Sequence, residues 1–118
     1  MNDKRKCIFI DIDGTIFEYH QNLYNMCMDE PVLLEGVIAK FLEWRQNDYY
    51  IVLTTARAEG TRFATEKQLA SVGVFYDKLI MGLPNGNRYL INDRKPDTGD
   101  SAFAICLDRD QGIGNIEL

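Results

Sequence analysis

Two carboxylates stand two residues apart where an apolar run of the chain ends. Residues 7–10 are all apolar, and they are followed by Asp11, Ile12, Asp13 and Gly14. Alternate residues of a strand face the same side, so Asp11 and Asp13 would share one small space at a strand end. Like charges this close are costly unless a cation lies between them or one of them is protonated. The spacing therefore indicates a chemical site.

This segment has two other possible interpretations, a simple turn and a calcium-binding loop. A single Asp-Gly pair is most often a turn, because both residues suit turn conformations. A calcium-binding EF-hand loop fails on spacing, because a loop starting at Asp11 needs Gly at position 16 and Glu at position 22. The chain has Ile16 and Asn22 at those positions.

Polar residues also follow two later apolar runs. Residues 49–54 form a predicted strand that leads into Thr55, Ala56 and Arg57. A hydroxyl there can donate a hydrogen bond to a phosphate oxygen, and a guanidinium can reach a substrate or a neighbouring carboxylate. Residues 89–92 form another predicted strand, which ends in Asn92 and is followed by Asp93. Thr is also common in strands and Asn-Asp in turns, so neither segment is decisive alone.

The predicted elements alternate between strand and helix. Strands are expected at residues 7–10, 49–54, 78–81, 89–92 and 102–106, and helices at residues 33–47 and 61–72. This alternation predicts an α/β domain with a mostly parallel sheet, and ligands bind such sheets at the carboxyl ends of the strands. We expect the two helices to pack through these residues: Leu34, Val37, Ile38, Phe41, Leu42 and Trp44 in the first, and Phe63, Ala64, Leu69 and Ala70 in the second.

Composition narrows the class of protein. The 118 residues suit one domain. A net charge of −5 and a pI near 4.8 argue against nucleic acid or an anionic membrane as partner. Cys7 and Cys106 lie in apolar runs and the cysteine count is odd, which predicts buried free thiols in a reducing compartment. No apolar run approaches the length of about 18 residues that spans a membrane, so we expect a cytoplasmic protein.

The segment Asp11-Ile12-Asp13-Gly14-Thr15 after an apolar strand resembles the first motif of the haloacid dehalogenase superfamily of phosphohydrolases. The resemblance implies a Rossmann-like three-layer domain in which Asp11 is the nucleophile and Asp13 the general acid/base. It also implies a Mg²⁺ ion bound to Asp11 and to the backbone carbonyl of Asp13. The loop through Gly14 and Thr15 would bind the phosphate.

The resemblance continues along nearly the whole chain. Thr55, in preference to its neighbour Thr54, matches the hydroxyl of the family's second motif, with Ala56 and Arg57 beside the substrate. The fourth motif is matched by Asn92 and Asp93, which would complete the Mg²⁺ shell. Asn92 departs from the family pattern, in which an aspartate usually stands.

The third motif is degraded. Many small relatives carry a lysine in Gly-Lys-Pro before the fourth strand, whereas this chain has Leu83 between Gly82 and Pro84. Two cations could replace that lysine, and of these Lys78 is preferred over Arg88.

The resemblance also implies a minimal member without a cap domain, because residues 15–34 and 58–80 leave room only for a short flap and one helix. The whole chain, residues 1–118, would be one phosphohydrolase domain. The expected substrate is a small sugar phosphate of carbohydrate or surface-polysaccharide metabolism. The alternatives are a nucleotide phosphatase and a non-catalytic module that binds a phosphorylated ligand or a protein. A homo-oligomer could cover the open site.

Overall fold

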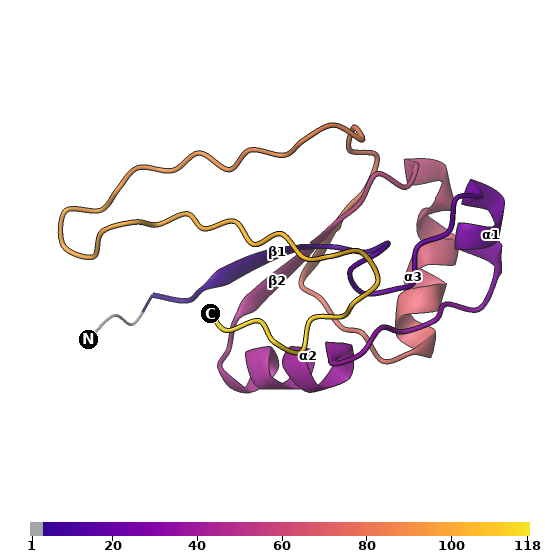
Figure 1. Ribbon diagram of the computed structural model, residues 1–118, viewed down its shortest axis with the longest axis horizontal. Helices are drawn as coiled ribbons and strands as arrows, with labels where there is room; N and C mark the ends of the chain where they lie inside the picture. Colours follow the sequence, from indigo (N-terminus) through magenta and orange to yellow (C-terminus); the bar gives the residue numbers. More distant parts are fainter. Residues whose placement is uncertain (1–3) are drawn as a thin grey trace.

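The structure is a computed structural model that describes residues 4–118, apart from the side chains of Leu23 and Tyr24. Three strands form one parallel sheet in the order β1-β2-β3 (Figure 1). In chain order the elements are β1 (Cys7–Asp11), α1 (Leu23–Met28), α2 (Val37–Gln46), β2 (Tyr50–Thr54), the short 3₁₀ helix η1 (Glu59–Thr61), α3 (Arg62–Ser71) and β3 (Lys78–Ile80). The predicted class, an α/β domain with a parallel sheet, is confirmed.

The register aligns the carboxyl ends of the strands. Asp11 of β1 lies opposite Thr54 of β2, and Thr54 lies opposite Ile80 of β3. Residues that follow β1 and β2 therefore emerge side by side at one edge, where parallel sheets bind ligands.

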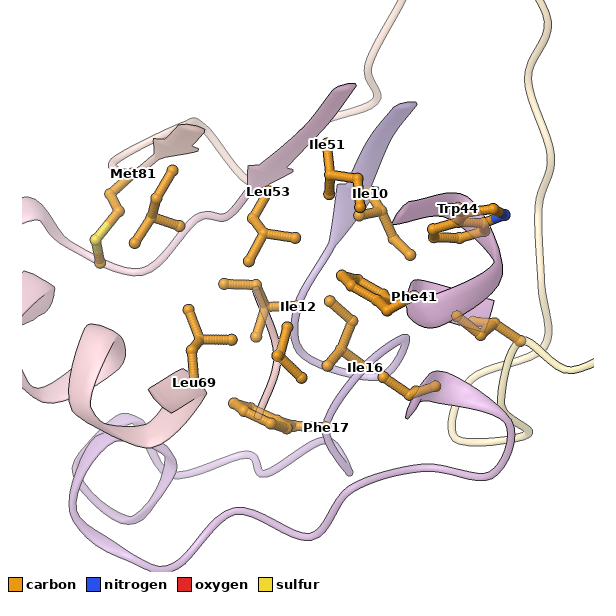
Figure 2. Close-up of a cluster of buried hydrophobic side chains, with 14 residues drawn as sticks. Ile10, Ile12, Ile16, Phe17, Phe41, Trp44, Ile51, Leu53, Leu69 and Met81 are labelled. Carbon is orange, nitrogen blue, oxygen red and sulfur yellow. The ribbon is translucent and has the colours of Figure 1, made fainter. Parts of the chain in front are cut away.

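One face of the sheet forms the core with α2 and α3. Figure 2 shows Ile10, Leu53 and Ile12 facing Phe41 of α2 and Leu69 of α3. Alternation along each strand sends the intervening residues to the opposite face. That face carries Phe9 and Ile80, which are 53% and 36% exposed. The sheet is thus well covered on one side and partly open on the other.

The predicted helix faces are correct in part. Helix α2 buries Val37, Phe41 and Trp44, but Ile38 and Leu42 are exposed. Helix α3 buries Leu69 as expected, whereas Phe63 is exposed. Ala70 is also exposed and Ala64 is half-buried. The other buried side chains of α3 are polar, Thr65 and Gln68, because a buried arginine requires hydrogen-bond acceptors on this face.

The strands predicted at residues 89–92 and 102–106 are absent from the described part of the chain. Residues 84–107, called the arm here, run out from the body and return as two extended legs (Figure 1). One isolated pair, Lys95 and Gly99, bridges the legs near the tip. An apolar segment becomes a strand only when a neighbour completes its hydrogen-bond ladder, and the arm has no such neighbour in this structure.

Two cysteine side chains that the sequence predicts to be buried are exposed in the structure. Cys7 lies on the outer strand β1 and Cys106 on the arm, and both are exposed. The prediction that these two side chains are buried is therefore wrong, although the cysteines of the described residues are free as expected. No helix in residues 4–118 is long and apolar enough to cross a membrane.

Both ends of the arm are anchored on the body. Before it, the amides of Gly82 and Leu83 donate to the carbonyls of Arg57 and Thr55 at 2.8 and 3.1 Å. After it, the amide of Asp110 donates to the carbonyl of Gly14 at 2.9 Å. Glycine is required at position 112, since its φ is +84° and a Cβ there would overlap the carbonyl of Glu35.

Candidate active site

Asp11 is the last residue of β1, and its side chain is 41% exposed at the carboxyl edge of the sheet. The Nη1 atom of Arg88 lies 3.5 Å from Asp11 Oδ1. Burial raises the pKa of the Asp11 carboxyl above its ordinary value, and the guanidinium of Arg88 partly offsets this rise. A half-exposed carboxylate beside a cation is accessible to a phosphorylated ligand.

The loop after β1 is a tight turn around one carbonyl. The oxygen of Ile12 accepts hydrogen bonds from the amides of Thr15, Ile16 and Phe17 at 3.2, 2.8 and 3.0 Å. The amide of Gly14 donates to the oxygen of Phe17 at 2.7 Å, and Gly14 has a φ of 86°, which glycine adopts readily. The amides of Gly14 and Thr15, predicted to bind phosphate, are thus used within the loop.

Asp13 forms a bidentate ion pair with Arg57. Arg57 Nη2 lies 2.8 Å from Asp13 Oδ1, and Arg57 Nε lies 2.9 Å from Oδ2. The Arg57 side chain is 2% exposed and the Asp13 side chain is 11% exposed. Such fork-to-fork geometry is the strongest form of arginine–carboxylate pairing. Arg57 therefore fixes the position of the second carboxylate of the motif.

The remaining donors of Arg57 are also satisfied. Nη1 donates to Gln68 Oε1 at 2.6 Å and to Thr65 Oγ1 at 3.1 Å, and Nη2 donates to the carbonyl of Met26 at 3.3 Å. All five N–H groups of the guanidinium thus have acceptors. Arg57 joins the end of β2, the loop after β1, α1 and α3.

Thr55 lies one residue beyond the end of β2 and is buried. Its Oγ1 accepts the amide of Arg57 at 3.0 Å. A threonine hydroxyl that accepts one bond still has one hydrogen to donate. Ala56 lies between these two residues and is half-buried. Thr55 can therefore donate toward a ligand at the edge where Asp11 lies.

Three predicted site residues lie elsewhere. Lys78 is exposed at the start of β3, opposite Val52, which is roughly 7 Å from the carboxyl edge. Asn92 and Asp93 belong to the arm, where both are exposed and lie just before Lys95 of the bridge between the two legs. Asp93 pairs with Lys95, which lowers the pKa of the Asp93 carboxyl.

The structure accordingly assembles only part of the predicted magnesium site. The carboxylate of Asp11 and the carbonyl of Asp13 are oxygen donors of the kind Mg²⁺ prefers. Asp93 does not join them, and residues 4–118 contain no group of three or more His, Cys, Asp or Glu side chains that could hold a metal ion. The donor set fits Mg²⁺ at Asp11 but is incomplete in this conformation.

Sequence reasoning missed the acceptors that hold Arg57. Thr65 and Gln68 are three residues apart and face the core together with Leu69. A polar pair at this spacing on the apolar face of a helix is the signal that could have identified them.

No protein-family model matches the sequence, and no curated protein matches it. Among solved structures, the chain is similar to a chain of the Pnkp1/Rnl/Hen1 RNA repair complex, with 28% identity and a TM-score of 0.58 over 71% of this chain. A second structure of the Pnkp1/Rnl/Hen1 complex gives 27% identity and a TM-score of 0.58 over 75% of this chain. A structural genomics target from Vibrio cholerae matches at 22% identity and a TM-score of 0.52, over 76% of this chain and 81% of that one.

The chain spans 27% and 32% of the two RNA repair chains that it matches. The likeness to the Vibrio cholerae protein shows a shared fold only. Together these likenesses support the α/β fold with its parallel sheet.

Proposed function

We propose that the chain is a phosphomonoester hydrolase of the haloacid dehalogenase type that works through an aspartyl-phosphate on Asp11. The observation that carries this proposal is the placement of Asp11: a half-exposed carboxylate at the carboxyl end of a parallel strand, 3.5 Å from Arg88. Asp13 stands two residues on, held by the buried Arg57. A module that only binds ligands has no need of two carboxylates this close, because they repel each other.

The chemistry follows from the residue types. An oxygen of Asp11 attacks phosphorus, a bond forms between them, and the bond to the leaving alkoxide breaks. In its protonated form Asp13 gives the alkoxide a proton, and the resulting carboxylate later takes one from the water that attacks the aspartyl-phosphate, which frees phosphate and restores Asp11 and protonated Asp13. The bidentate pair with Arg57 leaves one lone pair on each Asp13 oxygen for this exchange. Thr55 donates to the phosphoryl oxygens.

Mg²⁺ bound at Asp11 and the Asp13 carbonyl would offset the charge of the phosphoryl group. We expect turnover of p-nitrophenyl phosphate to require Mg²⁺ and to vanish with a chelator. Ca²⁺ should inhibit, because its larger and looser coordination misplaces the phosphate relative to Asp11. Full turnover in excess chelator would show that the reaction needs no metal ion.

The structure favours Arg88 over Lys78 as the cation that replaces the third-motif lysine. Arg88→Ala should cut kcat by roughly 100-fold, the scale of losing one preorganised charge contact. Lys78→Ala is the matched control and should change kcat little, because Lys78 lies at the start of β3, whereas Asp11 lies at the carboxyl edge of the sheet. Steady-state kinetics on p-nitrophenyl phosphate measure both, and the reverse ranking would assign the role to Lys78.

For the substrate we propose a small sugar phosphate. A second candidate is a phosphate on a nucleotide or a nucleic acid end, favoured by the likeness to chains of an RNA repair complex. The net charge of −5 disfavours a polynucleotide. A panel of hexose phosphates, nucleoside monophosphates and a 3′-phosphorylated oligonucleotide ranks them by kcat/KM. A preference for the oligonucleotide would replace the sugar phosphate proposal.

The non-catalytic alternative rests on two departures from the family pattern, Leu83 and Asn92. It predicts that phosphate binds, as calorimetry would detect, while p-nitrophenyl phosphate is not hydrolysed with or without Mg²⁺. Any Mg²⁺-dependent turnover lost in the Asp11→Asn variant excludes it.

A further inference from the structure

The segment that follows the arm returns to the loop after β1 before it reaches the start of α2 (Figure 1). Two successive residues of this segment, Arg109 and Asp110, contact the same two residues of the loop, Gly14 and Tyr19, and are called the clasp here. The amide of Asp110 donates to the carbonyl of Gly14 at 2.9 Å. The Oδ1 atom of Asp110 accepts the amide of Tyr19 at 2.8 Å.

Arg109 contacts these two loop residues through its side chain. Its guanidinium lies over the ring of Tyr19, with Cζ 3.9 Å from the ring centre, which is a cation–π contact. Its Cγ atom lies 3.2 Å from the position that a Cβ on Gly14 would take, so a side chain at position 14 would crowd the arginine stem. The clasp therefore holds residues 14–19 by backbone and side-chain contacts at both ends.

The backbone of Asp110 explains why a carboxylate stands at this position. Asp110 has a φ of 64°, a left-handed conformation that is uncommon outside glycine and least costly for Asp and Asn. Glycine would adopt it without strain. What the aspartate supplies and glycine lacks is the acceptor for the amide of Tyr19. This position is thus accounted for by the hydrogen bond to the loop, and the turn alone does not require an aspartate.

The clasp acts on Asp13 through Gly14. The amide of Gly14 donates to the oxygen of Phe17 at 2.7 Å and its carbonyl accepts the amide of Asp110, so both polar backbone groups of Gly14 are held. The peptide bond between Asp13 and Gly14 is trans and planar, which directs the Asp13 carbonyl opposite to the Gly14 amide and away from the turn. Arg57 fixes the side chain of Asp13, and the clasp fixes the backbone that follows it.

We propose that Asp110 is a positioning residue for the phosphatase reaction, because it holds the loop after β1 in the conformation that orients Asp13 for proton transfer. The inference rests on the proposed function, in which Asp13 is the general acid/base. Asp110 acts through Gly14 and Tyr19, and it is not assigned a contact with the substrate.

Two substitutions at position 110 separate the acceptor from the backbone conformation. Asp110→Asn keeps an acceptor oxygen and tolerates the left-handed φ, so its kcat on p-nitrophenyl phosphate should stay within about twofold of wild type. Asp110→Gly keeps the conformation but loses the acceptor. Its kcat should fall at least about tenfold with KM little changed, because Asp13 acts in the chemical steps and small displacements of such groups are costly.

Hydrogen exchange measured by NMR gives a readout that does not depend on activity. The amide of Tyr19 is the donor to Asp110, so its exchange should be at least about tenfold faster in Asp110→Gly than in the wild type. Asp110→Asn should restore the protection. The two variants thus test the bond itself as well as its effect on kcat.

Asp77→Ala is the matched control for a general loss of stability. Asp77 Oδ2 accepts the amide of Ile51 at 2.8 Å, a bond of the same kind and length at the amino end of β2. Thermal unfolding compares the stabilities of the two variants that lose an acceptor. Asp77→Ala should keep wild-type kcat, because the bond that it loses does not restrain the loop after β1.

The possible failures are distinguishable. Wild-type kcat in Asp110→Gly, an equal loss of kcat in Asp110→Asn, or a similar loss in Asp77→Ala would overturn the positioning role while leaving the phosphatase proposal in place. Unchanged exchange of the Tyr19 amide in Asp110→Gly would show that the clasp does not restrain the loop, which also overturns it. A wild type that hydrolyses no p-nitrophenyl phosphate would overturn the phosphatase proposal and the positioning role together.

Discussion

Replacing Asp11 with asparagine will abolish hydrolysis of p-nitrophenyl phosphate while leaving the domain folded. The amide is nearly isosteric with the carboxylate, but it cannot form the covalent intermediate. Loss of a nucleophile costs several orders of magnitude in kcat, so the variant should keep less than about a hundredth of wild-type turnover. Burial raises the pKa of Asp11, which means that its charge is a cost to the fold; the neutral amide should not weaken folding.

Steady-state kinetics measure the loss of turnover in Asp11→Asn, and thermal unfolding measures whether the variant is as stable as the wild type. Asp77→Asn is a suitable comparison, since Asp77 accepts the amide of Ile51 at the opposite end of the sheet and lies away from Asp11. That variant should retain turnover. Residual turnover above the stated level in Asp11→Asn would show that Asp11 is not the nucleophile.

Replacing Arg57 with alanine will strongly destabilise the fold. It removes the partner of the nearly buried Asp13 and leaves the side chains of Thr65 and Gln68 without their donor. Breaking a buried pair by removing one partner costs about 3–5 kcal/mol of unfolding free energy. The total free energy of unfolding of a small domain is about 5–15 kcal/mol, so the variant should lose much of its stability.

Urea unfolding at fixed pH measures this loss. Arg5→Ala serves as the control, because Arg5 pairs with Asp48 on the surface at 3.2 Å and exposed pairs contribute little. A double-mutant cycle with Asp13→Ala isolates the coupling between Arg57 and Asp13. Equal unfolding free energies for Arg57→Ala and Arg5→Ala would contradict the structural role given to Arg57.

The sequence predicted well those features that depend on neighbouring residues. An unbroken apolar run followed by Asp11 was enough to place a strand and its polar end, and the same logic placed Thr55 at the end of β2. The alternation of elements was enough to predict the parallel sheet, although the short helix α1 was not foreseen.

Features that depend on distant residues were not predictable in the same way. The apolar run at residues 89–91 looks like a strand locally, but a strand requires a neighbouring strand, and this structure supplies none. Asp13 and Arg57 are 44 residues apart, so only the folded chain shows that they pair. Arg57 of this pair also explains why the prediction that Phe63 faces the core was wrong. The buried face of α3 supplies hydrogen-bond acceptors to Arg57, and Phe63 is exposed instead.

The order in which residues are added during synthesis affects when the loop after β1 can reach its final conformation. Residues 7–80 contain every strand of the sheet, and they leave the ribosome before the segment that follows the arm. Yet the carbonyl of Gly14 and the amide of Tyr19 are both bonded to Asp110, at 2.9 and 2.8 Å. During synthesis the sheet can therefore form first, while the loop that carries Asp13 acquires these two restraints only after Asp110 has been added.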